Sequence, residues 1–312
     1  RDRSPSRGLG DVYKRQVSEV ALREVGRRNP FQRGHVTIVE WSEVPDFIEA
    51  EAPRDADQLV MRLSELKPAD VARELHDMDP TLRGEVVKAM ADEQLAEALE
   101  ELPEDEQVAV IASLDTERAA DVLEEMDPDD AADLIAELDS ALAEDILERM
   151  EPEEAQDVRT LLTYDAATAG GLMNPEPVIL AADATVADAL ASLRRPEITP
   201  AMAALAFICR SPLDTPTGRY LGAVHIQRLL REPPSVLAAG LIDPDIPPLT
   251  PASNIAQVSR YFATYDLVCA PVVDSNRRLL GAVTVDDVLD HILPNDWRGV
   301  QLDRLEAEVN DG

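Results

Sequence analysis

Leucine or methionine recurs every twelve residues across nearly a hundred residues of this chain. Counted from each of these anchors, further apolar residues stand near +5 and at +8, +9 and +12, which is the i, i+3, i+4, i+7 spacing of one helix face. Each repeat is therefore predicted to form one short helix. The anchors are Leu66, Met78, Met90, Leu102, Leu114, Met126, Leu138, Met150 and Leu162.

The start of each repeat is typical of a helix N-terminus. In Asp79-Pro80 and Asp127-Pro128, an acidic N-cap residue precedes a proline at the first helical position. Eight such helices in series, each too short to be stable alone, must pack on their neighbours. We predict an all-α superhelical solenoid built from twelve-residue repeats. Its anchors should be buried, each in a different helix: Leu102, Leu114, Met126, Leu138 and Met150.

The predicted helices are strongly acidic. Residues 101–160 contain 22 Asp or Glu against three Arg, a net charge of −19. Acidic residues in a first helical turn are favourable, but Glu124, Glu125 and Glu148 fall at expected C-termini, where the helix dipole disfavours them by roughly 0.3–1 kcal/mol each. We interpret these residues as a sign that a cation binds nearby.

Composition and charge exclude several classes of protein. A net charge of −33 opposes nucleic-acid binding. The sequence has neither an apolar run long enough to span a membrane nor a secretory signal, so we expect a cytoplasmic protein. The four histidines are scattered and there is no phosphate-binding loop, so we expect no enzymatic activity. Cys209 and Cys269 lie in apolar, strand-like runs and are predicted to be buried thiols.

The C-terminal half contains a second repeat. The segment 172–175 (LMNP) aligns with 241–244 (LIDP) at an offset of 69, and 222–226 (GAVHI) aligns with 281–285 (GAVTV) at an offset of 59. The ten-residue difference falls on a polar insertion at 210–219. Each copy reads as a strand, a helix, two strands and a helix, and two such copies are expected to pack as one α/β unit.

These two copies resemble a tandem pair of CBS domains, and the acidic repeats resemble the N-terminal cytosolic domain of MgtE-type magnesium channels. The resemblance covers roughly residues 60–293. It is carried by the junction 164–175 (YDAATAGGLMNP) and by the run 281–290 (GAVTVDDVLD). His225 and Arg228 depart from the Thr or Ser and the Asp usual in the first CBS copy. The family's membrane domain has no counterpart here, so we expect that this chain does not itself transport Mg²⁺.

The pattern predicts six segments. Residues 1–16 are interpreted as a non-native leader, and 17–48 as the remnant of a small β domain resembling a PRC barrel, with strands near 35–41 and 44–48. Residues 55–163 form the MgtE-N-like helical superhelix. The first CBS domain covers 164–235, the second covers 236–293, and a polar tail follows at 294–312.

Carboxylates near the junction are the candidate metal ligands. Mg²⁺ retains most of its waters and needs only one or two carboxylates per ion. Several ions could therefore bridge two acidic domains. The alternative is that these residues are solvated surface, with Asp127 a helix cap. The predicted ligands are Asp127, Asp129, Asp130, Asp165, Asp266, Asp287 and Asp290.

A second candidate ligand is an adenine nucleotide. Thr284 and Asp287 stand where CBS pairs often hold ribose hydroxyls, although the same Thr-x-x-Asp spacing also makes a helix capping box.

The resemblance thus implies a Mg²⁺-sensing regulatory module that forms a homodimer through its CBS domains. Its protein partner is unidentified, and a membrane transporter is one candidate. Two alternatives remain open at this point: a metal-independent protein-binding scaffold and a nucleotide-sensing CBS module.

Overall fold

The computed structural model describes residues 19–23, 36–40, 56–195 and 198–293, and it divides the chain into two compact units, 1–59 and 60–312. In the first unit, β1 (Glu19–Arg23) pairs antiparallel with β2 (Val36–Glu40). The strand predicted near 35–41 is therefore confirmed, and β1 is a partner that the sequence analysis missed. The predicted leader, the strand near 44–48 and the tail lie outside the described residues.

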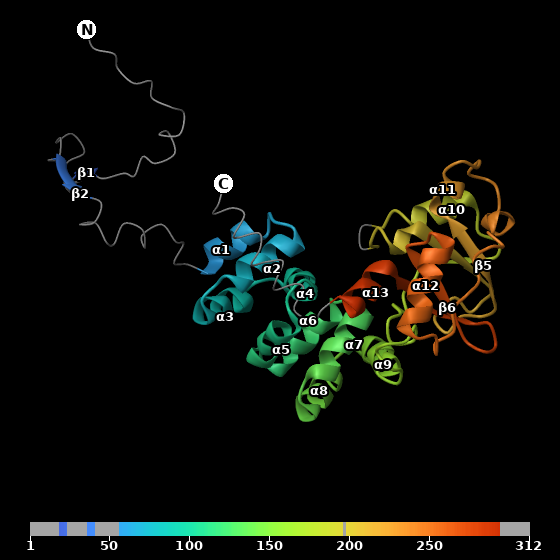
Figure 1. The fold of residues 1–312 in the computed structure, drawn as a ribbon, viewed down its shortest axis with the longest axis horizontal. Coiled ribbons are helices and arrows are strands. Elements are labelled where there is room, and N and C mark those ends of the chain that lie inside the picture. Colours follow the sequence, from blue (N-terminus) through green and yellow to red (C-terminus); the bar gives the residue numbers. More distant parts are fainter. Residues whose placement is uncertain (1–18, 24–35, 41–55, 196–197, 294–312) are drawn as a thin grey trace, which may run out of the picture. The chain divides into compact units, whose positions relative to one another are not determined.

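Eight helices between residues 66 and 162 confirm the twelve-residue repeat (Figure 1). Proline is the first residue of α3 and α7, as predicted from its fixed φ and missing N–H, and also of α2 and α9. With α1, which precedes them, the helices are α1 (Ala56–Leu63), α2 (Pro68–His76), α3 (Pro80–Ala89), α4 (Asp92–Glu100), α5 (Glu104–Ser113), α6 (Thr116–Glu124), α7 (Pro128–Glu137), α8 (Ser140–Leu147) and α9 (Pro152–Leu161).

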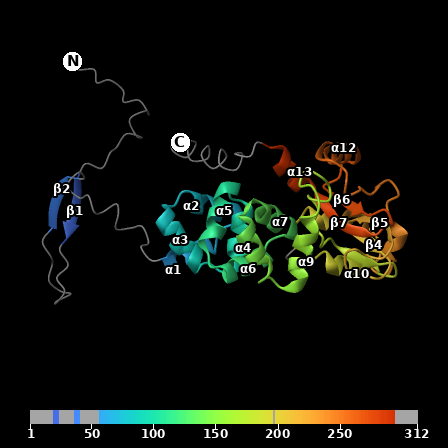
Figure 2. The same ribbon diagram turned by 90° about the horizontal axis from the view of Figure 1, so that it is seen from below.

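From α2 to α7, each helix packs against the helix two places further along the chain. Thus α2 contacts α4, α4 contacts α6 and α6 contacts α8, while α3, α5, α7 and α9 form the other series (Figure 2). The structural repeat is therefore a pair of helices, 24 residues long. This packing is compatible with the predicted superhelical solenoid.

The anchors lie between the helices, which corrects their predicted place within them. Leu102, Met126 and Met150 follow α4, α6 and α8, while Leu114 and Leu138 are the C-cap residues of α5 and α7. All except the half-buried Leu114 are at most 8% exposed. Each helix ends before its anchor because the residue directly after the anchor is the N-cap of the next helix. An apolar residue that follows a helix end packs back onto that helix.

Arginines cap the C-termini of neighbouring helices. The Arg118 guanidinium donates from Nη1 to the Lys88 carbonyl (2.7 Å) and from Nη2 to the Val87 (3.0 Å) and Met90 (2.7 Å) carbonyls, at the end of α3. Its Nε donates to Asp92 (3.0 Å). These are carbonyls that a helix end leaves without partners.

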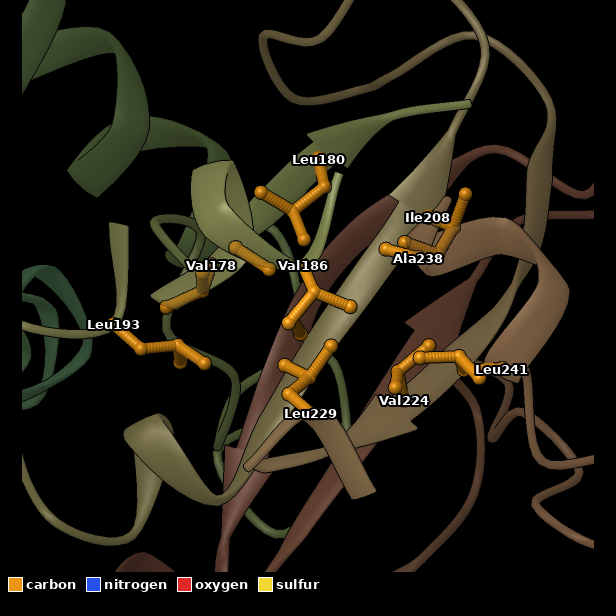
Figure 3. Packing of buried hydrophobic residues seen from close by; sticks show 11 residues of the cluster. Val178, Leu180, Val186, Leu193, Ile208, Val224, Leu229, Ala238 and Leu241 are labelled. Atoms are coloured by element: carbon orange, nitrogen blue, oxygen red, sulfur yellow. The ribbon is translucent and has the colours of Figure 1, made fainter. Parts of the chain in front are cut away.

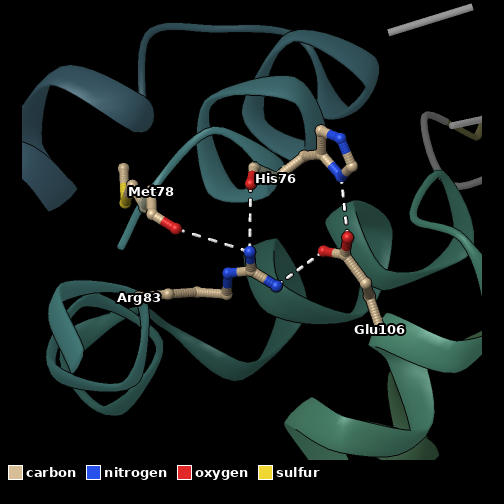
Figure 4. A network of polar contacts seen from close by, with 4 residues as sticks. All are labelled: His76, Met78, Arg83 and Glu106. Carbon is tan, nitrogen blue, oxygen red and sulfur yellow. Dashed lines mark hydrogen bonds and ion pairs between the residues drawn. The ribbon is translucent and has the colours of Figure 1, made fainter. Parts of the chain in front are cut away.

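The end of α2 is held in the same way (Figure 4). Arg83 donates from Nη2 to the His76 carbonyl (3.0 Å) and from Nη1 to Glu106 (2.6 Å). Glu106 also bonds the His76 ring through Nδ1 (2.7 Å). One carboxylate of α5 therefore fixes two side chains from the preceding helix pair.

Glutamates cap the N-termini of later helices. Glu100, the last residue of α4, accepts from the backbone N–H of Asp127 (3.0 Å), and Glu124, the last residue of α6, accepts from that of Glu151. Asp127 and Glu151 are the N-cap residues of α7 and α9. The two glutamates therefore have a structural role, and their place at a helix C-terminus is not by itself a sign of a bound cation.

The two C-terminal copies form the predicted α/β pair. In the first, β3 runs parallel to β4, which pairs antiparallel with β5; in the second, β6 pairs antiparallel with β7. The first strand expected in the second copy is reduced to one bridge, Leu249 with Val272. The first copy contains β3 (Ile179–Ala181), α10 (Val186–Ser192), η4 (Met202–Ala204), β4 (Leu205–Cys209), β5 (Tyr220–His225) and α11 (Ile226–Leu229). The second contains η5 (Ala238–Leu241), α12 (Ile255–Tyr265), β6 (Cys269–Val273), β7 (Leu279–Thr284) and α13 (Val285–Ile292).

Each copy pairs with the leading segment of the other. Asn174, which precedes β3 in the first copy, bridges Ala282 of β7, and Asp243, which precedes α12 in the second, bridges Ala223 of β5. These bridges join residues that correspond under the sequence offsets of 69 and 59. A Cβ on Gly281 would lie 2.5 Å from the Asn174 carbonyl oxygen, so the crossing needs glycine at that position.

Buried aliphatic side chains form the core of the first copy (Figure 3). Val186 from α10, Ile208 from β4, Val224 from β5 and Leu229 from α11 have no exposed surface. Cys209 and Cys269 are buried free thiols, as predicted.

Replacing Arg118 with Met should lower the free energy of unfolding by about 2–3 kcal/mol, because three carbonyls at the end of α3 lose a charged donor while the aliphatic packing is kept. Urea denaturation followed by circular dichroism measures this loss. Arg149→Met is the control. The Arg149 side chain is 42% exposed, and within the described residues its polar contacts are with Asp145 of the preceding helix, α8, so its loss should change stability by less than about 0.5 kcal/mol. Equal effects for both variants would show that the inter-helix cap does not stabilise the fold.

Candidate metal site

An acidic cavity of about 310 Å³ lies among α4, α5, α7 and α13. The cavity therefore lies between the helical domain and the last helix of the second CBS copy. No Lys or Arg among the described residues lines it. Its charged and titratable lining consists of Glu100, Glu104, Asp129, Asp130, Asp133, Glu137, Asp287, Asp290 and His291.

Helical spacing brings these groups together. On α7, Asp130, Asp133 and Glu137 stand at i, i+3 and i+7, and on α13, Asp287 and His291 stand at i and i+4. The opposite side of α7 is occupied by buried residues such as Ala131 and Ile135. The acidic side of α7 therefore faces the cavity.

Asn174 links the two walls of this site. Its Nδ2 donates to Asp127, the N-cap residue of α7 (3.1 Å), and its backbone exchanges two hydrogen bonds with Ala282 of β7 (2.9 Å each). Since α13 follows β7 directly, this 8% exposed side chain connects the start of α7 with the strand that positions α13.

Burial and like charge raise the pKa values of the cavity carboxyls. Burial is the main cause in each case, and it raises the pKa of Asp133 and of Asp287 to about 6 and that of Glu100 to about 7. The pKa values of Asp129 and Asp130 are raised well above the ordinary range, with the Asp287 charge adding to both. The ionised forms of these groups therefore lack compensating positive charge.

Asp129 is the most deeply buried of these acids. It is 7% exposed, and its Oδ1 has no hydrogen-bond partner among the described residues. An ionised carboxylate in that position is strongly unfavourable without a proton or a cation beside it. No group of three or more His, Cys, Asp or Glu within the described ranges is arranged as a complete metal site. An ion here would therefore keep water ligands.

Four of the seven predicted metal ligands line the cavity: Asp129, Asp130, Asp287 and Asp290. The other three do not. Asp127 accepts from Asn174, Asp165 accepts from the Ala167 backbone N–H (3.0 Å), and the exposed Asp266 ends α12 in the left-handed conformation (φ 54°).

The sequence analysis left five lining residues out of its predicted site: Glu100, Glu104, Asp133, Glu137 and His291. A signal for part of this set was present, because Asp133 and Glu137 continue the helical spacing that begins at Asp130.

The predicted nucleotide residues form a helix cap. The backbone N–H and the hydroxyl of Thr284 both donate to Asp287 Oδ2 (2.9 and 2.7 Å) at the start of α13. This is the capping alternative raised by the sequence. Asp287 therefore serves both the cap and the cavity.

The raised pKa values predict a pH effect. A carboxyl whose pKa is higher in the folded state stabilises the fold below its unfolded pKa and loses that contribution as pH rises through the folded value. Without divalent cations, the free energy of unfolding should therefore fall between about pH 4 and pH 7.

Asp130→Asn should recover about 1 kcal/mol at pH 8 and little at pH 4, because it removes one of the repelling charges. Urea denaturation in EDTA at both pH values measures this difference. A stability that is independent of pH would contradict the electrostatic account of the cavity.

Comparison with known families identifies two domains in the chain. Residues 66–167 match the MgtE intracellular N domain, and residues 238–294 match the CBS domain. The magnesium transporter MgtE of Thermus thermophilus is 35% identical over 133 residues, and that of Bacillus subtilis is 28% identical over 137. These alignments span 43% and 44% of this chain but only 28% and 29% of the two transporters.

Solved structures extend the match in fold. The cytosolic domain of the Mg²⁺ channel MgtE in complex with ATP is 30% identical with a TM-score of 0.68, covering 77% of this chain and 95% of that one. The soluble part of a magnesium transporter, 24% identical, has a TM-score of 0.69 over 76% of this chain and 91% of that one, and shows the shared fold. The prediction of a cytoplasmic location agrees with matches to an intracellular and a cytosolic domain.

Across the residues that the structure describes, no helix is long and apolar enough to cross a membrane. The chain therefore contains an MgtE intracellular N domain followed by a CBS pair, and it is homologous to MgtE magnesium transporters with the fold of their cytosolic portion.

Proposed function

We propose that this chain is a Mg²⁺-sensing regulatory module that acts on the cytoplasmic side of a membrane. The observation that carries the proposal is the acidic cavity between α7 and α13, where the helical domain meets the second CBS domain. It is lined by the buried Asp129, whose Oδ1 has no hydrogen-bond partner within the described part of the chain. The relatives' names, all magnesium transporters, support Mg²⁺ as the cation.

Electrostatics provides the mechanism. Without a cation, the carboxylates of α7 repel those of α13, so the closed arrangement of the two domains is unfavourable. The Debye length is about 8 Å at physiological ionic strength, so only carboxylates that face each other closely contribute. Asp129, Asp130 and Asp287 meet this condition, since the charge of Asp287 raises the pKa of both others.

Mg²⁺ reverses this balance. The ion needs only one or two carboxylates and retains its remaining waters, which suits a cavity without a complete ligand cage. Because Mg²⁺ binds the closed arrangement better than the open one, a rising Mg²⁺ concentration shifts the population toward closure. Hinge motion of two domains about a ligand is a common form of such a switch.

The readout requires a partner. We infer a homodimer through the CBS pair and a protein partner that responds to closure, for which a magnesium-conducting membrane domain is the first candidate because the relatives are transporters. In the rival function, the helical repeats present a binding surface for another protein, and cations have no effect on it.

Millimolar MgCl₂ should raise the melting temperature and reduce the radius of gyration, and KCl of equal ionic strength should do so far less. Binding to one arrangement adds stability according to ligand concentration, whereas screening depends on ionic strength alone. Differential scanning fluorimetry and small-angle X-ray scattering measure the two effects on the full chain.

The double variant Asp129→Asn, Asp130→Asn should lose most of the Mg²⁺ response, because both residues line the cavity. Asp266→Asn is the matched control: the residue is exposed and does not line the cavity, and Asn tolerates its left-handed conformation. Identical responses to the two salts would favour the metal-independent scaffold.

Nucleotide sensing is a second candidate, favoured by the ATP complex of the related cytosolic domain. In this chain Thr284 and Asp287 are present in the second CBS copy, while His225 and Arg228 occupy the corresponding positions of the first. The chemistry of the two positions therefore differs between the copies.

Isothermal titration should show at most one adenine nucleotide bound per chain. Thr284→Val should abolish that binding, because it removes the hydroxyl offered to ribose, and Arg228→Ala in the other copy should leave it unchanged. Two sites of similar affinity would show that the first copy also binds nucleotide.

A further inference from the structure

His291 is the one imidazole among the described side chains that line the acidic cavity. It lies in the last turn of α13, and its side chain is 26% exposed. A nitrogen ligand in a cavity of carboxylates changes which cations the cavity prefers, since Mg²⁺ favours oxygen ligands while imidazole suits first-row transition cations.

The hydrogen bonding of His291 determines which of its two ring nitrogens is available to bind a cation. Its Nδ1 lies 3.2 Å from the carbonyl oxygen of Asp287, one turn earlier in α13. A carbonyl only accepts, so Nδ1 carries the hydrogen and donates it, and the lone pair of the neutral ring is on Nε2. A ring N–H donated to a backbone carbonyl is the usual support of a metal-binding histidine.

The free nitrogen faces α7. Its Nε2 lies 3.7 Å from Oδ2 of Asp133, which is longer than the 2.7–3.2 Å of an ordinary N–H···O hydrogen bond. Two ligands at roughly 2.1 Å from one octahedral ion stand about 3 Å apart when adjacent and about 4.2 Å apart when opposite, so the observed separation needs only a small adjustment. Nε2 and Oδ2 are therefore placed to share one cation.

The buried acid beside them gives an independent indication of a ligand. Asp129 lines the same cavity, is 7% exposed and has an Oδ1 without a hydrogen-bond partner among the described residues. A cation held between α7 and α13 would compensate that carboxylate directly or through a bound water.

We propose that the cavity takes a first-row divalent transition cation in preference to Mg²⁺, with Nε2 of His291 and the carboxylate of Asp133 as its protein ligands and water completing the shell. This inference rests on the proposed function only in that the cavity must bind a divalent cation. It adds two residues, Asp133 and His291, to the site expected from the sequence, and it names a different class of ion.

Mn²⁺ is the probe, because it is paramagnetic and accepts both oxygen and nitrogen ligands. Pulsed electron paramagnetic resonance of the full chain with Mn²⁺ should show hyperfine coupling to a directly bound nitrogen. Isothermal titration should show tighter binding of Mn²⁺ than of Mg²⁺, with the two ions competing.

His291→Gln keeps a polar side chain of similar length and removes the imidazole. It should abolish the nitrogen coupling and weaken Mn²⁺ binding by about tenfold or more, and it should weaken Mg²⁺ binding far less. His76→Gln is the matched control, since that histidine pairs with Glu106 and does not line the cavity. Melting curves in EDTA confirm that both variants fold.

Mn²⁺ bound without nitrogen coupling, or an equal loss of both affinities in His291→Gln, would overturn this inference and leave the proposed Mg²⁺ sensor standing. Binding of neither cation to the unmodified chain would overturn both.

Discussion

Helices of eight to ten residues leave a large share of their backbone N–H and C=O groups without partners inside the helix, and the structure of the helical domain depends on how those groups are satisfied. Side chains from other repeats supply many of the missing partners. Arg118 reaches back to the end of α3, and Glu124 reaches forward to the start of α9. Charged residues that look like surface in the sequence therefore hold one helix pair to the next.

The acidic side of α7 is an exception to this pattern. Its carboxylates face α13 across a cavity, where burial and mutual repulsion raise their pKa values. A protein selected for stability alone would not bury Asp129 with an Oδ1 that has no hydrogen-bond partner in the described ranges, and such local conflicts concentrate at functional sites. The unfavourable charge at this joint makes the arrangement of the two domains sensitive to cations.

Asp287 connects the two ligands considered for this protein. It lines the cavity, and the same residue accepts two hydrogen bonds from Thr284 at the start of α13. A cation bound by this carboxylate and a nucleotide bound by Thr284 would therefore act on the same helix terminus. Any coupling between them would be reciprocal in binding free energy.

The sequence by itself determined the eight short helices, the tandem copies and the buried thiols, because periodicity, prolines and caps act locally and repeat. It also determined that Asp129, Asp130 and Asp287 are acids near a domain joint. Only the tertiary structure decided which acids meet. Glu100 and Glu124 each became the cap of a helix that begins 28 residues later, Asp266 stayed outside the cavity, and Asp133 and His291 came to face each other across 158 positions. The caps depend on how successive helix pairs stack, and the pairing of Asp133 with His291 depends on how α13 lies opposite α7. No local pattern encodes either arrangement.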